Sequence, residues 1–335
     1  MVKIKEKDVD AIYIHIPFCT QKCRYCDFYS TTGKRRFHPY GHNPQFINRL
    51  LQDIRFFKER YAVTSWKTVY IGGGTPSLLS PGDVRTLAAD ICGAQTEPIE
   101  EFTIEANPED ITLDWLAACN ESGINRLSVG VQSFDNTVLK CSGRRGSGEK
   151  TQTVLDMIKR YWHGALSCDL IAGLTGQTAQ SLTDDVRRLM DYRPEHISLY
   201  GLCSEEPLPA AREDFISELL QNTIALLAAG GYVQYEVSNF SYQDKHHSIH
   251  NQIYWKMEPY AGIGPAACGT FIHEDASGGF IAAERFEGVK DSAVWLTAAA
   301  RTSVYMYEAV DRQTFLKEVL LMGFRLLEGI NRTDF

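Results

Sequence analysis

The stretch AIYIHIPFCTQKCRYCDF, residues 11–28, decides the fold of this chain because it joins an apolar, strand-like run to three closely spaced cysteines. Cys19, Cys23 and Cys26 follow the pattern C-x3-C-x2-C, and no fourth cysteine follows at short range. Iron–sulfur clusters of the 4Fe–4S type are usually held by four thiolates. Three thiolates would leave one iron open to a small molecule. The stretch therefore predicts a reactive 4Fe–4S site rather than a simple electron carrier.

Two other uses of these cysteines fit the pattern less well. Structural zinc takes four ligands, usually from two paired motifs, whereas this run supplies three. A disulfide requires an oxidising compartment. The remaining cysteines have irregular spacing and are expected to be small buried residues. They are Cys92, Cys119, Cys141, Cys168, Cys203 and Cys268.

The start of the chain, MVKIKEKDVD, is polar and lacks the features of a signal peptide. The apolar run that follows is too short to span a membrane. We therefore expect a cytoplasmic protein without a transmembrane segment. The formal net charge is −8, which argues against non-specific nucleic-acid binding. A local basic pocket from Arg144, Arg145 and the run 34–36 stays open, although the run (Lys34, Arg35, Arg36) is more typical of a solvated loop.

Strand-like and helix-like patterns alternate along the first 230 residues. Strand-like runs lie at 11–16, 67–72, 101–106, 126–131, 166–171 and 196–201. Helical patterns lie at 44–60, 81–92, 112–121, 148–162, 178–191 and 211–229. Six such repeats predict an α/β fold, a partial (β/α)6 TIM-like barrel with a parallel sheet.

The pattern changes after residue 231. The segment 232–241 reads as one more strand, 275–310 is weakly patterned, and 314–329 reads as an amphipathic helix. We expect a core barrel over 1–235 and a barrel extension over 236–310. Residues 311–335 are expected to begin an α-rich C-terminal domain that the chain end cuts short.

Polar residues and glycines follow the predicted strands at their carboxyl ends, where barrel chemistry gathers. These residues are Gly72, Gly73, Gly74, Thr75, Pro76, Glu105, Asn107, Gln132, Asp169 and Tyr200. Consecutive glycines let a backbone approach a ligand, although they also suit a tight turn. A carboxylate such as Glu105 or Asp169 suits ribose hydroxyls or an amino group, and Arg144 suits a carboxylate. Each is also compatible with a helix cap or an ion pair.

The motif HNQIYW, residues 250–255, is a separate candidate site. One histidine among His246, His247 and His250 is compatible with a solvated loop. A histidine beside an asparagine and two large aromatics also resembles an axial ligand near a flat ring, because haem iron commonly takes a protein histidine. The candidate haem contacts are His250, Asn251, Tyr254 and Trp255.

Several ordered motifs together resemble the radical S-adenosylmethionine proteins of the coproporphyrinogen-dehydrogenase-like group. They are YIHIPFCTQKCRYCDF, IGGGTPS, IEANPED, RLSVGVQSF, DLIAGLTGQT, YEVSNFS and HNQIYW, and they span about residues 11–270. Within the group, the HemW-type haem chaperones match best and the HemN-type dehydrogenase is the neighbour. The resemblance implies a radical S-adenosylmethionine barrel and an electron donor such as a flavodoxin or ferredoxin.

The resemblance also implies roles for individual residues. Cys19, Cys23 and Cys26 would hold the cluster, and S-adenosylmethionine would chelate its fourth iron. Tyr13, Gly73 and Glu105 match contacts to that cofactor, and Tyr25 matches an aromatic beside its adenine. The positions that bind a second S-adenosylmethionine in the dehydrogenase are matched by Gly74, Thr75, Gln132, Arg144 and Asp169.

Three features favour the chaperone over the dehydrogenase. Phe28 stands where the dehydrogenase pattern has a further cysteine, only 18 residues precede Cys19, and HNQIYW matches the chaperone haem motif. Departures are Thr175 in place of a usual proline, a shortened segment at 202–214, and AACGTF at 266–271, which lacks a usual histidine.

The expected function is that of a haem chaperone, which binds haem as cargo and delivers it to an acceptor protein. The alternative is an oxygen-independent coproporphyrinogen III oxidase, and a third is radical-mediated haem opening or methyl transfer. Whether the chain is an enzyme, and whether it forms a homodimer, stays open at this point.

Overall fold

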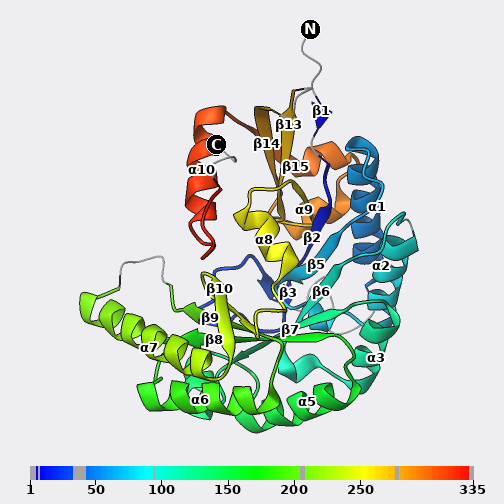
Figure 1. Cartoon of the computed structure of the whole chain (residues 1–335). Coiled ribbons are helices and arrows are strands. Elements are labelled where there is room, and N and C mark those ends of the chain that lie inside the picture. The colour runs from blue at the N-terminus through cyan, green and yellow to red at the C-terminus, as the bar shows by residue number, and fades with distance from the viewer. Residues whose placement is uncertain are drawn as a thin grey trace.

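The computed structural model describes residues 5–6, 8–32, 43–93, 95–203, 208–275 and 279–331 (Figure 1). The basic run Lys34, Arg35 and Arg36 lies outside these residues. Across the described part of the chain, helices are all too short or too polar to cross a membrane.

Six parallel strands form the centre of the molecule, and each pairs with the next one along the chain. They are β2 (Ala11–Ile16), β5 (Thr68–Gly73), β6 (Glu101–Ala106), β7 (Arg126–Gln132), β8 (Ala165–Ala172) and β9 (His196–Gly201). The register places Ile14 beside Ile71 and Ile71 beside Ile104, so apolar side chains form continuous rows across the sheet. The predicted partial barrel is confirmed.

Helices cover the outer face of this sheet, as Figure 1 shows for α2, α3, α5 and α6. The helices of the barrel are α1 (Pro44–Arg60), α2 (Pro81–Gly93), α3 (Leu113–Glu121), α4 (Asn136–Cys141), α5 (Gly148–Tyr161), α6 (Ala179–Tyr192) and α7 (Ala210–Ala229). Hydroxyl caps set several starts: Thr112 accepts a hydrogen bond from Trp115 N, and Ser147 from Lys150 N. Such caps stabilise a helix by about 1 kcal/mol because they satisfy free backbone N–H groups.

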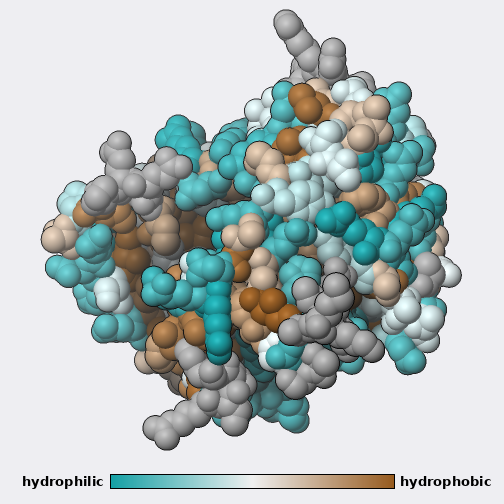
Figure 2. All heavy atoms as spheres, turned by 90° about the horizontal axis from the view of Figure 1, so that it is seen from above, coloured by the Kyte–Doolittle hydropathy of each residue, from teal (hydrophilic) through white to brown (hydrophobic). Residues whose placement is uncertain are grey.

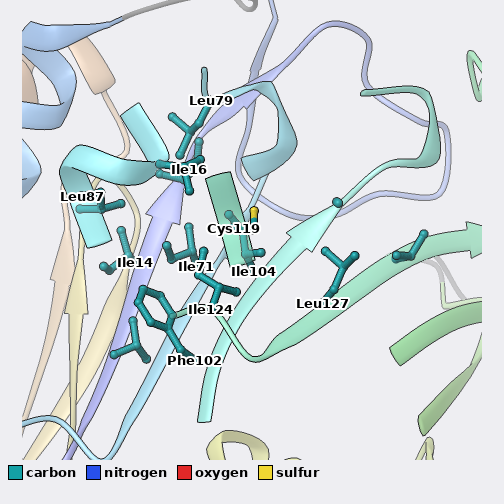
Figure 3. Close-up of a cluster of buried hydrophobic side chains, with 14 of the residues drawn as sticks. Ile14, Ile16, Ile71, Leu79, Leu87, Phe102, Ile104, Cys119, Ile124 and Leu127 are labelled. Carbon is teal, nitrogen blue, oxygen red and sulfur yellow. The ribbon is translucent and has the colours of Figure 1, made fainter. Parts of the chain in front are cut away.

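The core between sheet and helices is built from branched aliphatic side chains (Figure 3). Ile14, Ile71 and Ile104 point from neighbouring strands toward Leu87 of α2 and Cys119 of α3. Cys119 and Cys168 are buried as expected. The expectation of burial was wrong for Cys92, Cys203 and Cys268, which are exposed, and Cys141 is half-buried.

The segment predicted as one strand over 232–241 is a hairpin. It comprises β10 (Tyr232–Glu236) and β11 (Asn239–Tyr242), which pair antiparallel around a turn where Ser238 has a φ of 85°. β11 then pairs with β9. The sheet therefore runs without a break through residue 235, the expected end of the core barrel, which lies inside β10.

On the other edge, β12 (Tyr260–Ile263) runs parallel to β2 and carries three antiparallel strands. These are β13 (Cys268–Glu274), β14 (Phe280–Gly288) and β15 (Tyr305–Val310). The extension also contains α8 (Ile249–Trp255) and α9 (Ser292–Thr297), and α10 (Arg312–Gly323) follows in the segment 311–335. Short pieces complete the set: β1 (Lys5–Glu6), β3 (Phe18–Cys19) and β4 (Thr31–Thr32), with 3-10 turns at Pro76–Leu78, Pro108–Asp110 and Arg301–Val304.

The predicted helix over 314–329 ends early, at Gly323. Beyond it the backbone pairs with the β10–β11 hairpin, because Val237 N donates to Arg325 O and Leu327 N donates to Tyr235 O. The end of the described chain is therefore attached to this hairpin.

Candidate cofactor site at the strand ends

Two adjoining cavities lie at the carboxyl ends of the parallel strands. The narrow cavity, about 410 Å³, is lined by the three cysteines and the glycine-rich turn. The wide cavity, about 1000 Å³, extends toward α7, α8 and β13. Tyr70, Gly73, Glu105 and Tyr200 line both. Figure 2 looks onto the molecule from above and shows a hollow with apolar, brown-coloured walls.

The cysteine loop is docked against the barrel by polar contacts. Cys19 ends β3 and is buried, with its Sγ 3.4 Å from Thr75 Oγ1. Arg24 N donates to Ser142 O at 3.0 Å, and Gln21 Nε2 donates to Gly143 O at 2.8 Å. These contacts hold the loop against the segment that follows α4, so all three cysteines face one cavity.

Three thiols on one cavity are the sulfur ligands that the structure offers at this site. Structural zinc takes four protein ligands, whereas a 4Fe–4S cluster held by three thiolates keeps one iron open for a small molecule. Burial raises the pKa of the Cys26 thiol, and the neighbouring Cys19 and Cys23 add to the effect. The donor set therefore fits an iron–sulfur cluster better than zinc.

Gly73 and Gly74 of the glycine-rich turn pack closely against the protein interior and also line the narrow cavity. Gly73 has a φ of +111°, and a Cβ there would lie 2.6 Å from the His15 ring. A Cβ on Gly74 would lie 2.7 Å from Phe18 O. Both glycines also line the narrow cavity. The tight-turn and the ligand-approach interpretations are thus compatible at this position.

Glu105, at the end of β6, faces both cavities. Its Oε1 accepts a hydrogen bond from the Tyr70 hydroxyl at 2.8 Å, and its Oε2 accepts one from Gly73 N at 3.1 Å. Burial and the nearby Asp169 raise the pKa of the Glu105 carboxyl to about 7, against the lowering effect of these two donors. At neutral pH the group is poised between charged and neutral forms, as functional carboxyls often are.

Tyr13 lies on the wide cavity, in a relay that fixes one tautomer of His15. His15 Nε2 lies 3.0 Å from Tyr29 O, so this nitrogen donates. His15 Nδ1 then accepts from the Tyr13 hydroxyl at 2.9 Å. Burial lowers the pKa of His15 to about 4, so the ring is neutral at pH 7.

Arg144 and Gln132 bring unsatisfied polar atoms to the narrow cavity. Arg144 donates to Asn107 Oδ1 at 2.9 Å and to Gly130 O, yet its buried Nε has no partner in the described structure. Gln132 Oε1 is likewise buried and unpaired there, and this residue has a φ of 64°. Buried polar atoms without partners are rare in proteins and indicate a missing ligand or water. Arg145 pairs instead with Asp110 at 2.8 Å.

Asp169 and Tyr25 complete the narrow cavity. Burial raises the pKa of the Asp169 carboxyl, and Ser128 Oγ lies 3.4 Å from its Oδ2. Burial also raises the pKa of Tyr25, which lies beside the cluster cysteines. All of the predicted S-adenosylmethionine contacts except Tyr13 line this cavity, and Tyr13 lines the neighbouring one.

His250 is fully buried and engaged at both ring nitrogens. Nδ1 lies 2.8 Å from Thr68 Oγ1, and Nε2 lies 2.7 Å from the Tyr254 hydroxyl. Burial lowers the pKa of this histidine to about 3. Asn251, Tyr254 and Trp255 line the wide cavity, whereas His250 supports them from behind. Iron would have to displace one of the two hydrogen bonds to reach His250.

Sequence reasoning missed Arg126, which lines the narrow cavity. It is buried at the start of β7, and although burial opposes its charge, Glu101, Tyr70 and Asp169 raise its pKa. The available signal in the sequence was an arginine at the start of a mostly apolar strand. Tyr70, Cys268 and Arg325 were also missed as cavity residues because nothing local distinguishes them.

Comparison with known proteins decides the family. The sequence model of the radical SAM superfamily matches residues 13–189. The chain is 31% identical over 335 residues to the heme chaperone HemW of Lactococcus lactis, covering 96% of this chain and 83% of that protein. The chain belongs to the radical SAM superfamily and, within it, to the HemW family. These findings confirm the family that the motifs indicated.

Two further relatives extend this result. The chain is 33% identical over 339 residues to the mitochondrial radical S-adenosyl methionine domain-containing protein 1 of Bos taurus, covering 96% of this chain and 74% of the relative. Coproporphyrinogen III oxidase (HemN) of Escherichia coli superposes with a TM-score of 0.77 at 20% identity, over 96% of this chain and 76% of that one. At this identity the superposition establishes a shared fold. Membership of the superfamily implies a 4Fe–4S cluster and S-adenosylmethionine.

Proposed function

We propose that the protein is a haem chaperone: it binds haem in the wide cavity and passes it to an acceptor protein. The observation that carries the proposal is the position of this cavity. It lies against the HNQIYW residues and shares a wall with the cysteine-lined cavity. Its volume of about 1000 Å³ is at the upper end for ligand sites, which suits a large flat ring.

The narrow cavity would hold the cluster on Cys19, Cys23 and Cys26, with S-adenosylmethionine beside it. Together, when bound, these groups supply one-electron chemistry. The chain's own residues position and shield them: Gly73 and Glu105 line the wall, and Tyr25 lies beside the cysteines. Haem in the wide cavity would then lie next to the cluster site, so that cofactor state and haem binding can influence each other.

Aromatic side chains make the wide cavity suited to a porphyrin. Tyr254 and Trp255 come from α8, and Tyr260 comes from β12. Tyr254 packs edge-on to Tyr260 with ring centroids 4.6 Å apart. Such rings favour contact with another flat aromatic system. An acceptor protein and a reduced flavodoxin or ferredoxin are the partners that this function requires.

The alternative is coproporphyrinogen III oxidation, favoured by the shared fold with HemN. Phe28 bears on the choice. It is 69% exposed and lines both cavities, at the position where the dehydrogenase pattern has a further cysteine. A phenylalanine adds apolar surface there and cannot take part in thiol chemistry. We therefore prefer the chaperone.

The test is an anaerobic haem titration of the cluster-reconstituted protein, followed by Soret absorbance. We expect saturable, equimolar binding that is weakened in Trp255→Ala, which alters the cavity wall directly. His250→Ala removes the buried support behind that wall and is expected to alter the spectrum. His163→Ala, an exposed histidine away from both cavities, is the matched control and is expected to bind as the wild type does.

The same preparation is assayed with coproporphyrinogen III and S-adenosylmethionine. Non-saturating haem binding that ignores Trp255→Ala would contradict the chaperone proposal. Conversion of coproporphyrinogen III to protoporphyrinogen IX at a useful rate would establish the alternative.

A further inference from the structure

The wide cavity offers few groups able to ligate haem iron. Iron in haem takes histidine, cysteine thiolate, methionine or tyrosine from the protein. His15 lines the cavity and His250 lies behind its wall, and each of these histidines has both ring nitrogens hydrogen-bonded. The tyrosines that line the cavity have hydroxyls engaged by other side chains: Tyr13 by His15, Tyr29 by Ser292, Tyr70 by Glu105, Tyr200 by Ser198, Tyr254 by His250 and Tyr260 by Thr270. Two thiols remain among the lining residues, Cys203 and Cys268.

Cys268 is the better placed of the two thiols. It begins β13, which is hydrogen-bonded to β12 on one side and β14 on the other, so its backbone is held rigidly. Its side chain is exposed to the cavity and has no hydrogen-bond partner among the described residues. Cys203 lies two residues beyond the end of β9, and its Sγ contacts Gly201 O at 3.6 Å. A ligand on a rigid strand is positioned more accurately than one on a loop.

The cavity around Cys268 contains a second group that lacks a partner. Asn239 is 2% exposed and lines the same cavity, and its Oδ1 accepts no hydrogen bond within the described structure. A buried amide oxygen without a donor indicates a ligand or water that supplies one. The unpaired Asn239 oxygen therefore indicates, independently of the thiol, that this cavity takes a ligand or a water molecule.

Arg325 adds a positive charge to the same cavity. Its guanidinium stacks over Trp255 at 4.9 Å from the ring centroid. Its charge acts to lower the pKa of the buried Glu236 carboxyl, but among the described residues no carboxylate lies within ion-pair distance of the guanidinium. Because arginine binds carboxylates well, this group suits a ligand with an acidic side chain.

We propose that Cys268 is the axial thiolate ligand of haem in the wide cavity, with Arg325 binding a haem propionate. This inference rests on the proposed function and deepens it. Formation of the iron–sulfur bond releases the thiol proton to solvent and changes no oxidation state. Burial and the nearby Glu287 raise the pKa of the Cys268 thiol. Binding to iron offsets this raised pKa, because a thiol that coordinates a metal ion loses its proton.

The test compares Cys268→Ser with Cys203→Ser, the other thiol of the cavity, in the whole 335-residue chain after cluster reconstitution. Ferric haem is added, and difference spectra against haem-free protein remove the cluster absorbance. We expect a thiolate-type low-spin EPR signal from the ferric complex and, after reduction with dithionite under carbon monoxide, the red-shifted Soret band of the ferrous carbonyl complex. Both are expected to disappear in Cys268→Ser and to persist in Cys203→Ser. Cys268→His is expected to convert the spectrum to an imidazole type.

The outcomes separate this inference from the function beneath it. Saturable haem binding with an unchanged spectrum in Cys268→Ser overturns the ligand assignment and leaves the chaperone proposal standing. Absence of saturable binding in the wild type overturns the chaperone proposal itself. Circular dichroism and iron content, equal in all variants, show that the substitutions leave the fold and the cluster intact.

Arg325 is tested with a ligand change. We expect Arg325→Gln to weaken the binding of ferric protoporphyrin IX several-fold and to leave binding of its dimethyl ester unchanged, because the ester has no carboxylate. Equal weakening for both ligands would overturn the role of Arg325 as a carboxylate anchor.

Discussion

The Sγ atom of Cys19 lies 3.4 Å from Thr75 Oγ1, and this contact joins the cysteine loop to the glycine-rich turn of the barrel. Asn107 Nδ2 donates to the same hydroxyl at 3.4 Å. The hydroxyl proton is therefore left to point at the sulfur. Once Cys19 is a thiolate ligand, Thr75 is its hydrogen-bond donor.

This contact predicts an effect on the reduction potential of the cluster. Hydrogen bonds to cluster sulfurs tune the potential, and a donor stabilises the more negative, reduced state. Thr75→Val removes the donor and keeps the shape, so the potential is expected to fall, whereas Thr75→Ser is expected to retain the wild-type value. A redox titration monitored by EPR measures both. Equal potentials in the three proteins would show that the contact is absent in the loaded site.

The pKa of Glu105 predicts a pH-dependent stability. Burial raises this pKa from 4.5 to about 7. Between these values the folded protein keeps a proton that the unfolded chain releases, so stability falls as pH rises through this window. Glu105→Gln removes the contribution, and its stability is expected to fall less steeply from pH 5 to pH 7.5. Urea unfolding of cofactor-free protein at both pH values measures the slopes, and identical slopes would contradict a raised pKa.

The parallel strands of the fold could be predicted because their local sequence alone indicates them. Each of the parallel strands lies within one residue of its expected position because a strand buried on both faces is continuously apolar. The extension was harder to predict. Strand β14 has an irregular burial pattern, and the hairpin turns at Val237 and Ser238, which carry no Gly or Pro signal. Pairing with distant strands determines these elements, and such pairing leaves little trace in the local sequence.

The candidate site also contains residues that the sequence could predict and residues that it could not. The cysteines and strand-end residues were predictable because the topology of a parallel barrel brings strand ends together. The position of His250 behind the cavity wall was not, since it depends on Thr68 and Tyr254 taking both ring nitrogens. Arg325 reaches the wide cavity only because α10 stops at Gly323 and the chain turns back toward β10.

The hydrogen bonds of Asp53 predict how much the contact between the extension and the barrel contributes to stability. This carboxylate is fully buried in α1 and accepts hydrogen bonds from Arg301, from Trp295 Nε1 at 3.1 Å and from the Tyr305 hydroxyl. Asp53→Ala leaves the largely buried Arg301 side chain without its partner, which typically costs about 3–5 kcal/mol. Urea unfolding measures the loss.

A surface ion pair provides the control for Asp53. Arg85 and Glu121 are 2.8 Å apart with both side chains largely exposed. Glu121→Ala is therefore expected to cost about 0–1 kcal/mol. If Asp53→Ala were as mild as this control, the network would not fasten the extension.

The close packing around Gly74 predicts that the cysteine loop keeps its position only if residue 74 has no side chain. A Cβ at this position would lie 2.7 Å from Phe18 O and 3.0 Å from Ile16 O, both backbone atoms that cannot rotate away. Gly74→Ala is therefore expected to push the backbone leading to Cys19 outward and to reduce the iron and sulfide bound after reconstitution. Gly93→Ala, where a Cβ would meet nothing within 4 Å, is expected to load a full cluster. Full loading of Gly74→Ala would mean that the loop shifts freely, which its contacts to Ser142 and Gly143 argue against.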